Sequence, residues 1–125
     1  LDVSWPARAE EASGGKTSPE ELLAAAHAGC FVTGLAGEIA SAGGAVDRLD
    51  VRCTVIMDEV AGKGHVIVAS ELEVEARAEG IDADVFERVV RAADDGCPFS
   101  ALIRASATVT VRARLSSDGG GSNGD

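Results

Sequence analysis

The segment Leu22–Ala42 constrains the fold most, because it is long, apolar on nearly every side and bounded by clear helix signals. Ser18 is a good N-cap, Pro19 suits the first helical position, and Glu21 is placed to complete a capping box. The pair Gly43–Gly44 forms the matching stop signal. A helix with hardly any polar face belongs inside a fold, so we expect it to be central and buried, packed against a second chain.

Three further segments show the alternation of a β-strand with one buried face. Apolar residues recur at alternate positions from 49 to 57, from 66 to 77 and from 105 to 115. The turn Ala61–Gly64 joins the first two segments into a hairpin. Three strands make a thin sheet beside so apolar a helix, so we expect further strands from an N-terminal segment, a partner chain or both.

Two more helices and a polar tail complete the predicted order. Asp82 is placed to cap a helix that ends at Gly96, and Pro98 suits the first turn of a short helix. This order predicts a single α+β domain over residues 1–115, with central buried helices packed against an antiparallel sheet. The tail, residues 116–125, contains only Gly, Ser, Asp and Asn, so we expect it to be disordered.

The charge of the chain bears on its partners. The formal net charge is −10, from 11 Lys and Arg against 21 Asp and Glu. This balance argues against nucleic acid or an anionic membrane as a partner, because both bind basic surfaces. No uninterrupted apolar run reaches the roughly 18 residues that cross a bilayer, and no basic segment followed by an apolar one opens the sequence. We therefore expect a cytoplasmic protein.

The sequence contains three cysteines, Cys30, Cys53 and Cys97. Their spacing matches no metal motif such as C-x-x-C, so we expect neither a metal nor another cofactor. Cys97 begins a helix, where free N–H groups stabilise a thiolate, whereas Cys30 needs a cation or a polar partner to ionise among apolar residues. A buried cysteine is most often a small apolar side chain, and we keep that interpretation for Cys53.

The surroundings of two of these cysteines resemble a known family. Residues 17–31, TSPEELLAAAHAGCF, closely resemble the T/N-P-E-E-L-x-A-A-A-H-A-A-C-F signature of the OsmC/Ohr peroxidases. Residues 96–100, GCPFS, resemble the second cysteine motif of that family, which reads C-P-V-S or C-P-Y-S. The histidine at position 27, three residues before Cys30, resembles the OsmC branch of the family, since the Ohr branch tends to carry Tyr at this position.

This resemblance implies an OsmC-like fold in an intertwined homodimer, and the activity of an organic hydroperoxide reductase. Cys30 then matches the peroxidatic cysteine, whose thiolate attacks an organic hydroperoxide and becomes a sulfenic acid. Cys97 matches the resolving cysteine, which closes a disulfide with Cys30. In relatives a dithiol of the dihydrolipoamide type reduces that disulfide. We expect a substrate pocket of Ala, Leu and Phe residues that favours an apolar R group.

The resemblance also assigns a role to Glu20, which matches a glutamate that orients an arginine beside the reactive thiolate. In relatives this arginine comes from an N-terminal β-hairpin, a segment that we expect to be missing from this domain, and we assign its role to neither Arg8 nor Lys16. Glu20 and Cys30 are ten positions apart, about 15 Å along one straight helix. If both serve one site, an arginine bridges them or the glutamate comes from the other chain.

Some alternatives stay open at this point. His27 is either a catalytic base or a histidine whose hydrogen bonds are satisfied inside the core. Beside the peroxidase, two other functions agree with the sequence. One is a dimer of this fold that binds a small apolar ligand without catalysis, and the other is a redox sensor whose two cysteines form a disulfide without turnover.

Overall fold

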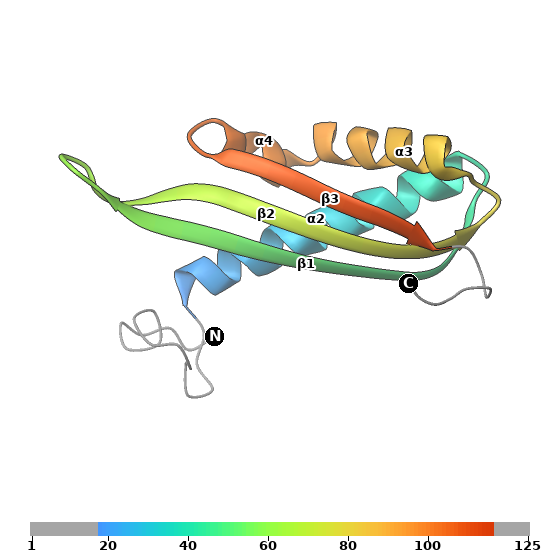
Figure 1. Cartoon of the computed structure of the whole chain (residues 1–125), viewed down its shortest axis with the longest axis horizontal. Coiled ribbons are helices and arrows are strands. Elements are labelled where there is room, and N and C mark those ends of the chain that lie inside the picture. Colours follow the sequence, from blue (N-terminus) through green and yellow to red (C-terminus); the bar gives the residue numbers. More distant parts are fainter. Residues whose placement is uncertain (1–17, 117–125) are drawn as a thin grey trace.

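The structure is a computed structural model, and it describes residues 18–116 of the chain (Figure 1). The elements follow the order α2 (Pro19–Ser41), β1 (Ala45–Val60), β2 (Gly64–Glu79), α3 (Ala83–Asp95), α4 (Pro98–Arg104) and β3 (Thr108–Ser116). This α+β order is the one that the sequence predicts. The predicted tail lies outside the described residues from position 117 onward, whereas Ser116, which we placed in that tail, ends β3.

Both ends of α2 have the caps that the sequence predicts. At the start, the backbone N–H of Glu21 donates to Ser18 Oγ at 3.2 Å. At the end, Gly43 has a φ of +90°, which favours glycine, and its N–H donates to the carbonyl of Ala40 at 3.0 Å. The N–H of Gly44 donates to the carbonyl of Ile39 at 2.9 Å. These two bonds form a Schellman motif, which ends the helix and turns the chain into β1.

The three strands form a mixed sheet in the order β1-β2-β3, not the antiparallel sheet that we expected. β1 and β2 pair antiparallel through the predicted hairpin, but β2 and β3 are parallel. The reason lies in the connection from β2 to β3, which contains both α3 and α4. A connection of this length returns the chain to the starting end of β2, so β3 enters the sheet in the direction of β2.

The helices cover one face of this sheet, and the core lies between them and the sheet (Figure 1). Phe31, Leu35 and Ile39 of α2 have no exposed surface, and they recur at every fourth position, so they form a single stripe. Burying each of these side chains contributes roughly 1.5–3 kcal/mol. The stripe meets the inner face of β2 and the buried face of α3, which contribute Leu72, Val74, Ala76, Ala78, Phe86, Val89, Val90 and Ala93.

The other face of the sheet is charged and exposed. Arg112 and Arg114 of β3 donate to Glu73 and Glu75 of β2, at 2.9 and 2.6 Å. Such exposed pairs contribute little to stability, but a face built from them does not favour a second apolar layer. The sheet therefore uses one face for the core, in the alternation that the sequence predicts.

Within residues 18–116, α2 is buried along one stripe, and the expected packing against a second chain stays a prediction. By length and composition alone α2 also meets the criterion for a membrane-spanning helix, with 22% of its most apolar window buried. The sequence does not show an uninterrupted apolar run here because His27, Thr33 and Glu38 lie within it. The core helix of a soluble protein and a signal sequence both meet the same criterion, and within residues 18–116 the buried stripe of α2 packs on the sheet.

A glycine contact at the junction of α2, β1 and β2 gives the first prediction. Gly80 has a φ of +88°, and a Cβ there would lie 2.9 Å from the carbonyl oxygen of Gly43. We expect Gly80→Ala to lower the free energy of unfolding by roughly 2–4 kcal/mol, since it combines left-handed strain with this clash. Urea unfolding measures the loss.

Gly62 in the hairpin turn is the matched control for this prediction. Its φ is +82°, but a Cβ there would meet nothing within 4 Å. Gly62→Ala should therefore lower the free energy of unfolding by only about 1–2 kcal/mol, from backbone strain alone. Equal losses of unfolding free energy in the two variants would show that the contact with Gly43 does not contribute to the effect of Gly80→Ala.

Candidate functional site

The structure brings Cys30 and Cys97 together in one cavity of about 420 Å³. Cys30 comes from the middle of α2, and Cys97 lies between the end of α3 and the start of α4. The other residues that line the cavity are Thr33, Gly34, Glu38, Ala92, Ala93 and Gly96. We expected Ala, Leu and Phe to line it; Ala92 and Ala93 do, but no Leu or Phe of residues 18–116 does. Phe31 and Leu35 point into the core instead, because they belong to the buried stripe of α2.

Cys30 is partly exposed, and its thiol is close enough to Cys97 for the two side chains to interact. Burial raises the pKa of the Cys30 thiol, and the neighbouring thiol of Cys97 raises it further. The backbone N–H of Phe99, in the first turn of α4, lowers this pKa by hydrogen bonding to the sulfur. The net direction is upward, so the described residues hold Cys30 mainly as a thiol.

Cys97 is the N-cap of α4 and is 3% exposed. The backbone N–H of Ser100 donates to its sulfur at 3.5 Å, and its own N–H donates to the carbonyl of Asp94 at 3.2 Å. Pro98 at the first helical position fixes the direction in which α4 begins. Cys97 therefore has a defined position and is more buried than Cys30.

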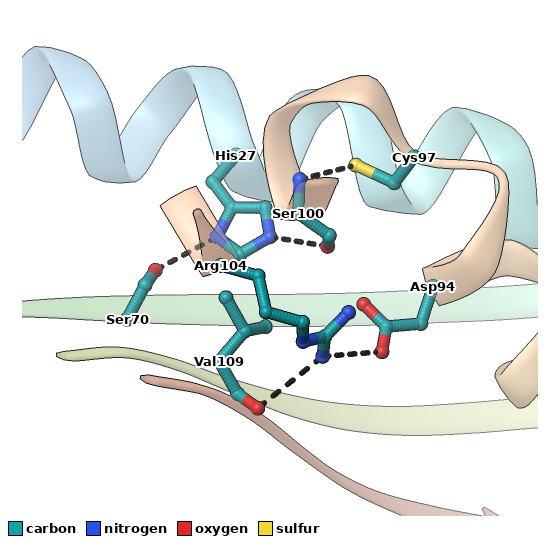
Figure 2. A network of polar contacts seen from close by, with 7 residues as sticks. All are labelled: His27, Ser70, Asp94, Cys97, Ser100, Arg104 and Val109. Carbon is teal, nitrogen blue, oxygen red and sulfur yellow. Dashed lines mark hydrogen bonds and ion pairs between the residues drawn. The ribbon is translucent and has the colours of Figure 1, made fainter. Parts of the chain in front are cut away.

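His27 is fully buried, and both of its ring nitrogens have partners (Figure 2). Nδ1 lies 2.7 Å from the hydroxyl of Ser70 on β2, and Nε2 lies 2.8 Å from the hydroxyl of Ser100 on α4. Burial lowers the pKa of His27, the carboxylate of Asp94 opposes this shift, and the guanidinium of Arg104 adds to it. The geometry therefore favours the interpretation of His27 as a satisfied core histidine over that of a base in contact with substrate.

Cys53 lies on the inner face of β1, beside the same histidine. Its sulfur is 3.2 Å from the hydroxyl of Ser70 and 3.8 Å from Nδ1 of His27. Burial raises the pKa of Cys53, and the bond with Ser70 opposes that shift. Cys53 is not among the residues that line the cavity with Cys30. This position agrees with the interpretation of a small, partly buried side chain.

An ion pair holds the segment around Cys97 from its other side. Arg104, the last residue of α4, donates to the carboxylate of Asp94 at 2.8 Å and to the carbonyl of Val109 at 3.3 Å (Figure 2). Asp94 Oδ1 is buried and has no hydrogen-bond partner among the described residues. The pair ties the end of α3 to the end of α4, so the short segment that carries Cys97 is fixed on both sides.

Our reading of the sequence missed these polar residues, although one of them gives a signal. Ser70 occupies an even position of β2, the same side of the strand as Leu72 and Val74, and it is fully buried. A serine on the apolar side of an alternating strand needs a polar partner in the core. Asp94 and Arg104 show no comparable signal, because charged residues are common on the surfaces of helices.

Glu20 does not reach the cavity in this chain. It lies in the first turn of α2, partly buried, and is not among the residues that line the cavity. Because Glu20 and Cys30 belong to the same helix, about 15 Å of helical rise separates them. An acidic residue in the first turn also interacts favourably with the helix dipole. Arg8 and Lys16 lie outside the described residues.

Neither a second cavity nor a metal site competes with this cavity among residues 18–116. A cavity of about 690 Å³ lies between α3 and β3 and contains neither cysteine, so we place the chemistry in the smaller one. Across residues 18–116, no group of three or more His, Cys, Asp or Glu side chains is placed to hold a metal ion.

Comparisons with known proteins agree with the resemblance in the sequence. The model of a family described as OsmC-like protein matches residues 12–112. The peroxiredoxin OsmC of Escherichia coli strain K12 is 37% identical over 93 residues, which cover 74% of this chain and 64% of the relative, just under two thirds of its length. The organic hydroperoxide resistance protein of Xanthomonas axonopodis pv. citri is 31% identical over 111 residues, which cover 87% of this chain and 75% of the relative.

Several solved structures have a fold similar to that of this chain. The organic hydroperoxide resistance protein OhrB of Bacillus subtilis has a TM-score of 0.68 at 25% identity, over 79% of this chain and 71% of that protein. The organic hydroperoxide resistance protein OsmC of Legionella pneumophila has a TM-score of 0.63 at 25% identity, over 85% and 74% of the two chains. A hypothetical protein of Aquifex aeolicus VF5, at 13% identity, has a TM-score of 0.72 over 83% and 77%, which shows the fold alone.

The buried histidine gives the second prediction. Because the pKa of His27 is lowered in the folded chain, the unfolded chain binds this proton first as the pH falls. The free energy of unfolding should therefore decrease from about pH 6.5 towards pH 5, by at most about 1.4 kcal/mol per unit. In His27→Gln this slope should be lost, whereas in His65→Gln, which changes an exposed histidine, it should persist. Urea unfolding across this pH range measures both slopes, and an unchanged slope in His27→Gln would contradict the assignment.

Proposed function

The chain belongs to the OsmC-like protein family, and on this premise we propose that it is a thiol-dependent peroxidase that reduces organic hydroperoxides to alcohols. The observation that carries the proposal is the shared cavity of Cys30 and Cys97. A partly exposed thiol faces the cavity, and a second, buried thiol lies beside it. This arrangement suits a reaction in which one sulfur is oxidised and the other then reacts with it.

The proposed reaction balances in two steps. First, the thiolate of Cys30 attacks the terminal oxygen of ROOH, an S–O bond forms as the O–O bond breaks, and the alkoxide leaves as ROH after taking a proton. Then the sulfur of Cys97 attacks the sulfur of Cys30, an S–S bond forms, and the S–O bond breaks. The thiol proton of Cys97 leaves with the departing hydroxide as water. One hydroperoxide is reduced for each disulfide formed.

The attacking thiolate needs help that the described residues do not give. The pKa of Cys30 is raised, and no cation among residues 18–116 is a cause of a shift in it. We assign the activation to an arginine that Glu20 orients, as in relatives. Since Glu20 is about 15 Å along α2 from Cys30, the arginine has to bridge this distance, or the glutamate has to come from a second chain.

The cavity supports an organic substrate. Ala92, Ala93 and Gly34 provide a small apolar surface next to Cys30, while Thr33 and Glu38 provide polar groups. Burial of an apolar R group against the alanines contributes about 25 cal/mol of binding free energy per Å² of apolar surface buried. We therefore propose organic hydroperoxides as the preferred substrates, and a dithiol of the dihydrolipoamide type as the reductant of the disulfide. A disulfide that is reduced in every cycle agrees with our proposal of a cytoplasmic location.

We also propose that the functional form is a homodimer that covers the open sides of α2. Gly29, Gly34 and Gly37 lie in this helix, and a Cβ added to any of them would meet nothing within 4 Å. Each glycine inside a helix costs roughly 0.5–1 kcal/mol relative to alanine. No close contact in the described part of the chain offsets this loss of stability, whereas the close approach of a second copy to these glycines would.

The third prediction concerns the two cysteines. With cumene hydroperoxide as the substrate, Cys30→Ser should consume no peroxide. Cys97→Ser should consume about one equivalent and then stop at the sulfenic acid, because the second sulfur is missing. In the unmodified chain, two thiols should be lost for each equivalent, and peptide mapping should find a disulfide between Cys30 and Cys97. Thiol titration before and after peroxide measures each outcome.

Cys53→Ser is the matched control, because this cysteine lies outside the cavity, and it should behave as the unmodified chain does. Equal activity in Cys30→Ser and Cys97→Ser would contradict the assigned roles. If the unmodified chain keeps all three thiols after peroxide treatment, a binding protein of this fold would be favoured. A disulfide that forms but does not turn over with a dithiol would favour a redox sensor.

The fourth prediction tests the dimer. Gly37→Leu adds bulk to an exposed position of α2 where the single chain has open space, so it should weaken association at least tenfold while a monomer stays folded. Arg88→Leu changes an exposed position of α3 and should leave association unchanged. Sedimentation equilibrium over a range of concentrations measures both. A chain that is monomeric throughout the micromolar range would overturn the homodimer.

A further inference from the structure

The hydrogen bonds of His27 connect α2, which carries Cys30, to the first turn of α4, where Cys97 lies. His27 lies on α2, three residues before Cys30. Its Nε2 is 2.8 Å from the hydroxyl of Ser100, and the backbone N–H of Ser100 donates to the sulfur of Cys97 at 3.5 Å. Figure 2 shows this continuous path from α2 through the imidazole to the first turn of α4. No role in peroxide attack accounts for it, because the ring is fully buried.

We propose that His27 is a positioning residue for disulfide closure, which holds the first turn of α4 so that the sulfur of Cys97 stays beside that of Cys30. This inference rests on the proposed function and adds to it a residue that acts only in its second step. The rate of that step depends on how often the two sulfurs meet in line, and a displacement of about 1 Å can cost roughly 100-fold in such reactions.

The short helix needs a tether because its apolar anchoring is slight. α4 has seven residues, and only Ser100 and Ile103 among them are buried. Leu102 is 66% exposed. The ion pair between Arg104 and Asp94 holds the far end of α4, but the side chain of Arg104 is 43% exposed, so solvent weakens that pair. The bond between His27 and Ser100 is the buried tie, and it acts in the same turn as Cys97.

The chemistry of the contact also suits a fixed link. A neutral imidazole has one N–H donor and one acceptor nitrogen, and a serine hydroxyl can either donate or accept. One hydroxyl therefore accepts from the ring while the other donates to it, so both ring nitrogens are satisfied. Ser70 on β2 binds one ring nitrogen, and Ser100 binds the opposite one. The ring is carried by the backbone of α2, so its bond to Ser100 links α2 to α4, whereas its bond to Ser70 serves only to satisfy the second nitrogen.

The fifth prediction separates closure from attack in Ser100→Ala. This variant keeps the backbone N–H that faces Cys97 but loses the hydroxyl that His27 holds. After one equivalent of cumene hydroperoxide, we expect peroxide consumption by Cys30 at the rate of the unmodified chain, and disulfide formation at least tenfold slower. The sulfenic acid should accumulate and should be trapped by dimedone, as detected by mass spectrometry.

Ser70→Ala is the matched control, because it removes the other hydroxyl from the same ring. Both serines are fully buried, so the two variants should lose similar amounts of stability in urea. Closure in Ser70→Ala should stay within about twofold of the unmodified chain. A general loosening of the core would slow both variants alike, and that result would overturn the tether.

A triple variant keeps the inference testable if Ser100→Ala does not fold. His27→Leu, Ser70→Ala and Ser100→Ala together replace the whole polar cluster by apolar groups, which leaves no unsatisfied polar atom among the three. It should close the disulfide as slowly as Ser100→Ala.

The outcomes also separate this inference from the proposed function. If the unmodified chain forms neither sulfenic acid nor disulfide, the peroxidase proposal fails, and the tether fails with it. If the unmodified chain forms the disulfide and either tether-deficient variant closes it equally fast, the tether alone is overturned.

Discussion

The packing of one stripe of α2 against the sheet determines the rest of the structure. Phe31, Leu35 and Ile39 are fully buried at every fourth position, and His27 precedes them in the same row. Because a helix is rigid, burial of this row also fixes the direction of every other side chain on α2. Cys30 lies one position before Phe31, so its place at the side of the stripe, facing α3 and α4, follows from burial of the core rather than from a contact of its own.

The second cysteine is positioned in a different way. Cys97 lies in a short connection, and a seven-residue helix cannot bury enough apolar surface to fix its own orientation. Polar contacts therefore take over, with His27 and Ser100 on the buried side and Asp94 with Arg104 on the partly exposed side. Apolar burial places the cysteine proposed to act first, and buried hydrogen bonds place the cysteine proposed to act second. Such bonds are directional, which suits a group whose position has to be exact but whose burial energy is small.

The sequence predicts the elements well and their relations less well. Ser18, Asp82 and Pro98 carry local capping signals, and the structure confirms the helix starts that they predict. The direction of β3 has no local signal, because parallel and antiparallel strands alternate in the same way. The bonds of His27 join positions 43 and 73 residues away, so no window of sequence contains them. The pairing of the two cysteines came from the family resemblance, and the structure then supplies a shared cavity for it.

Closeness and reactivity are separate properties in this site. The cavity brings the two sulfurs together, but the same burial and the same neighbouring thiol raise the pKa of Cys30, so the arrangement that favours disulfide closure disfavours the thiolate needed for attack. A cation next to Cys30 would resolve this conflict, because a positive charge lowers the pKa of a thiol without separating the sulfurs. The open sides of α2 leave room for such a group beside the cavity. Within residues 18–116, the uncovered glycines of α2 and the raised pKa of Cys30 thus agree with our proposal that a second surface meets α2 near Cys30.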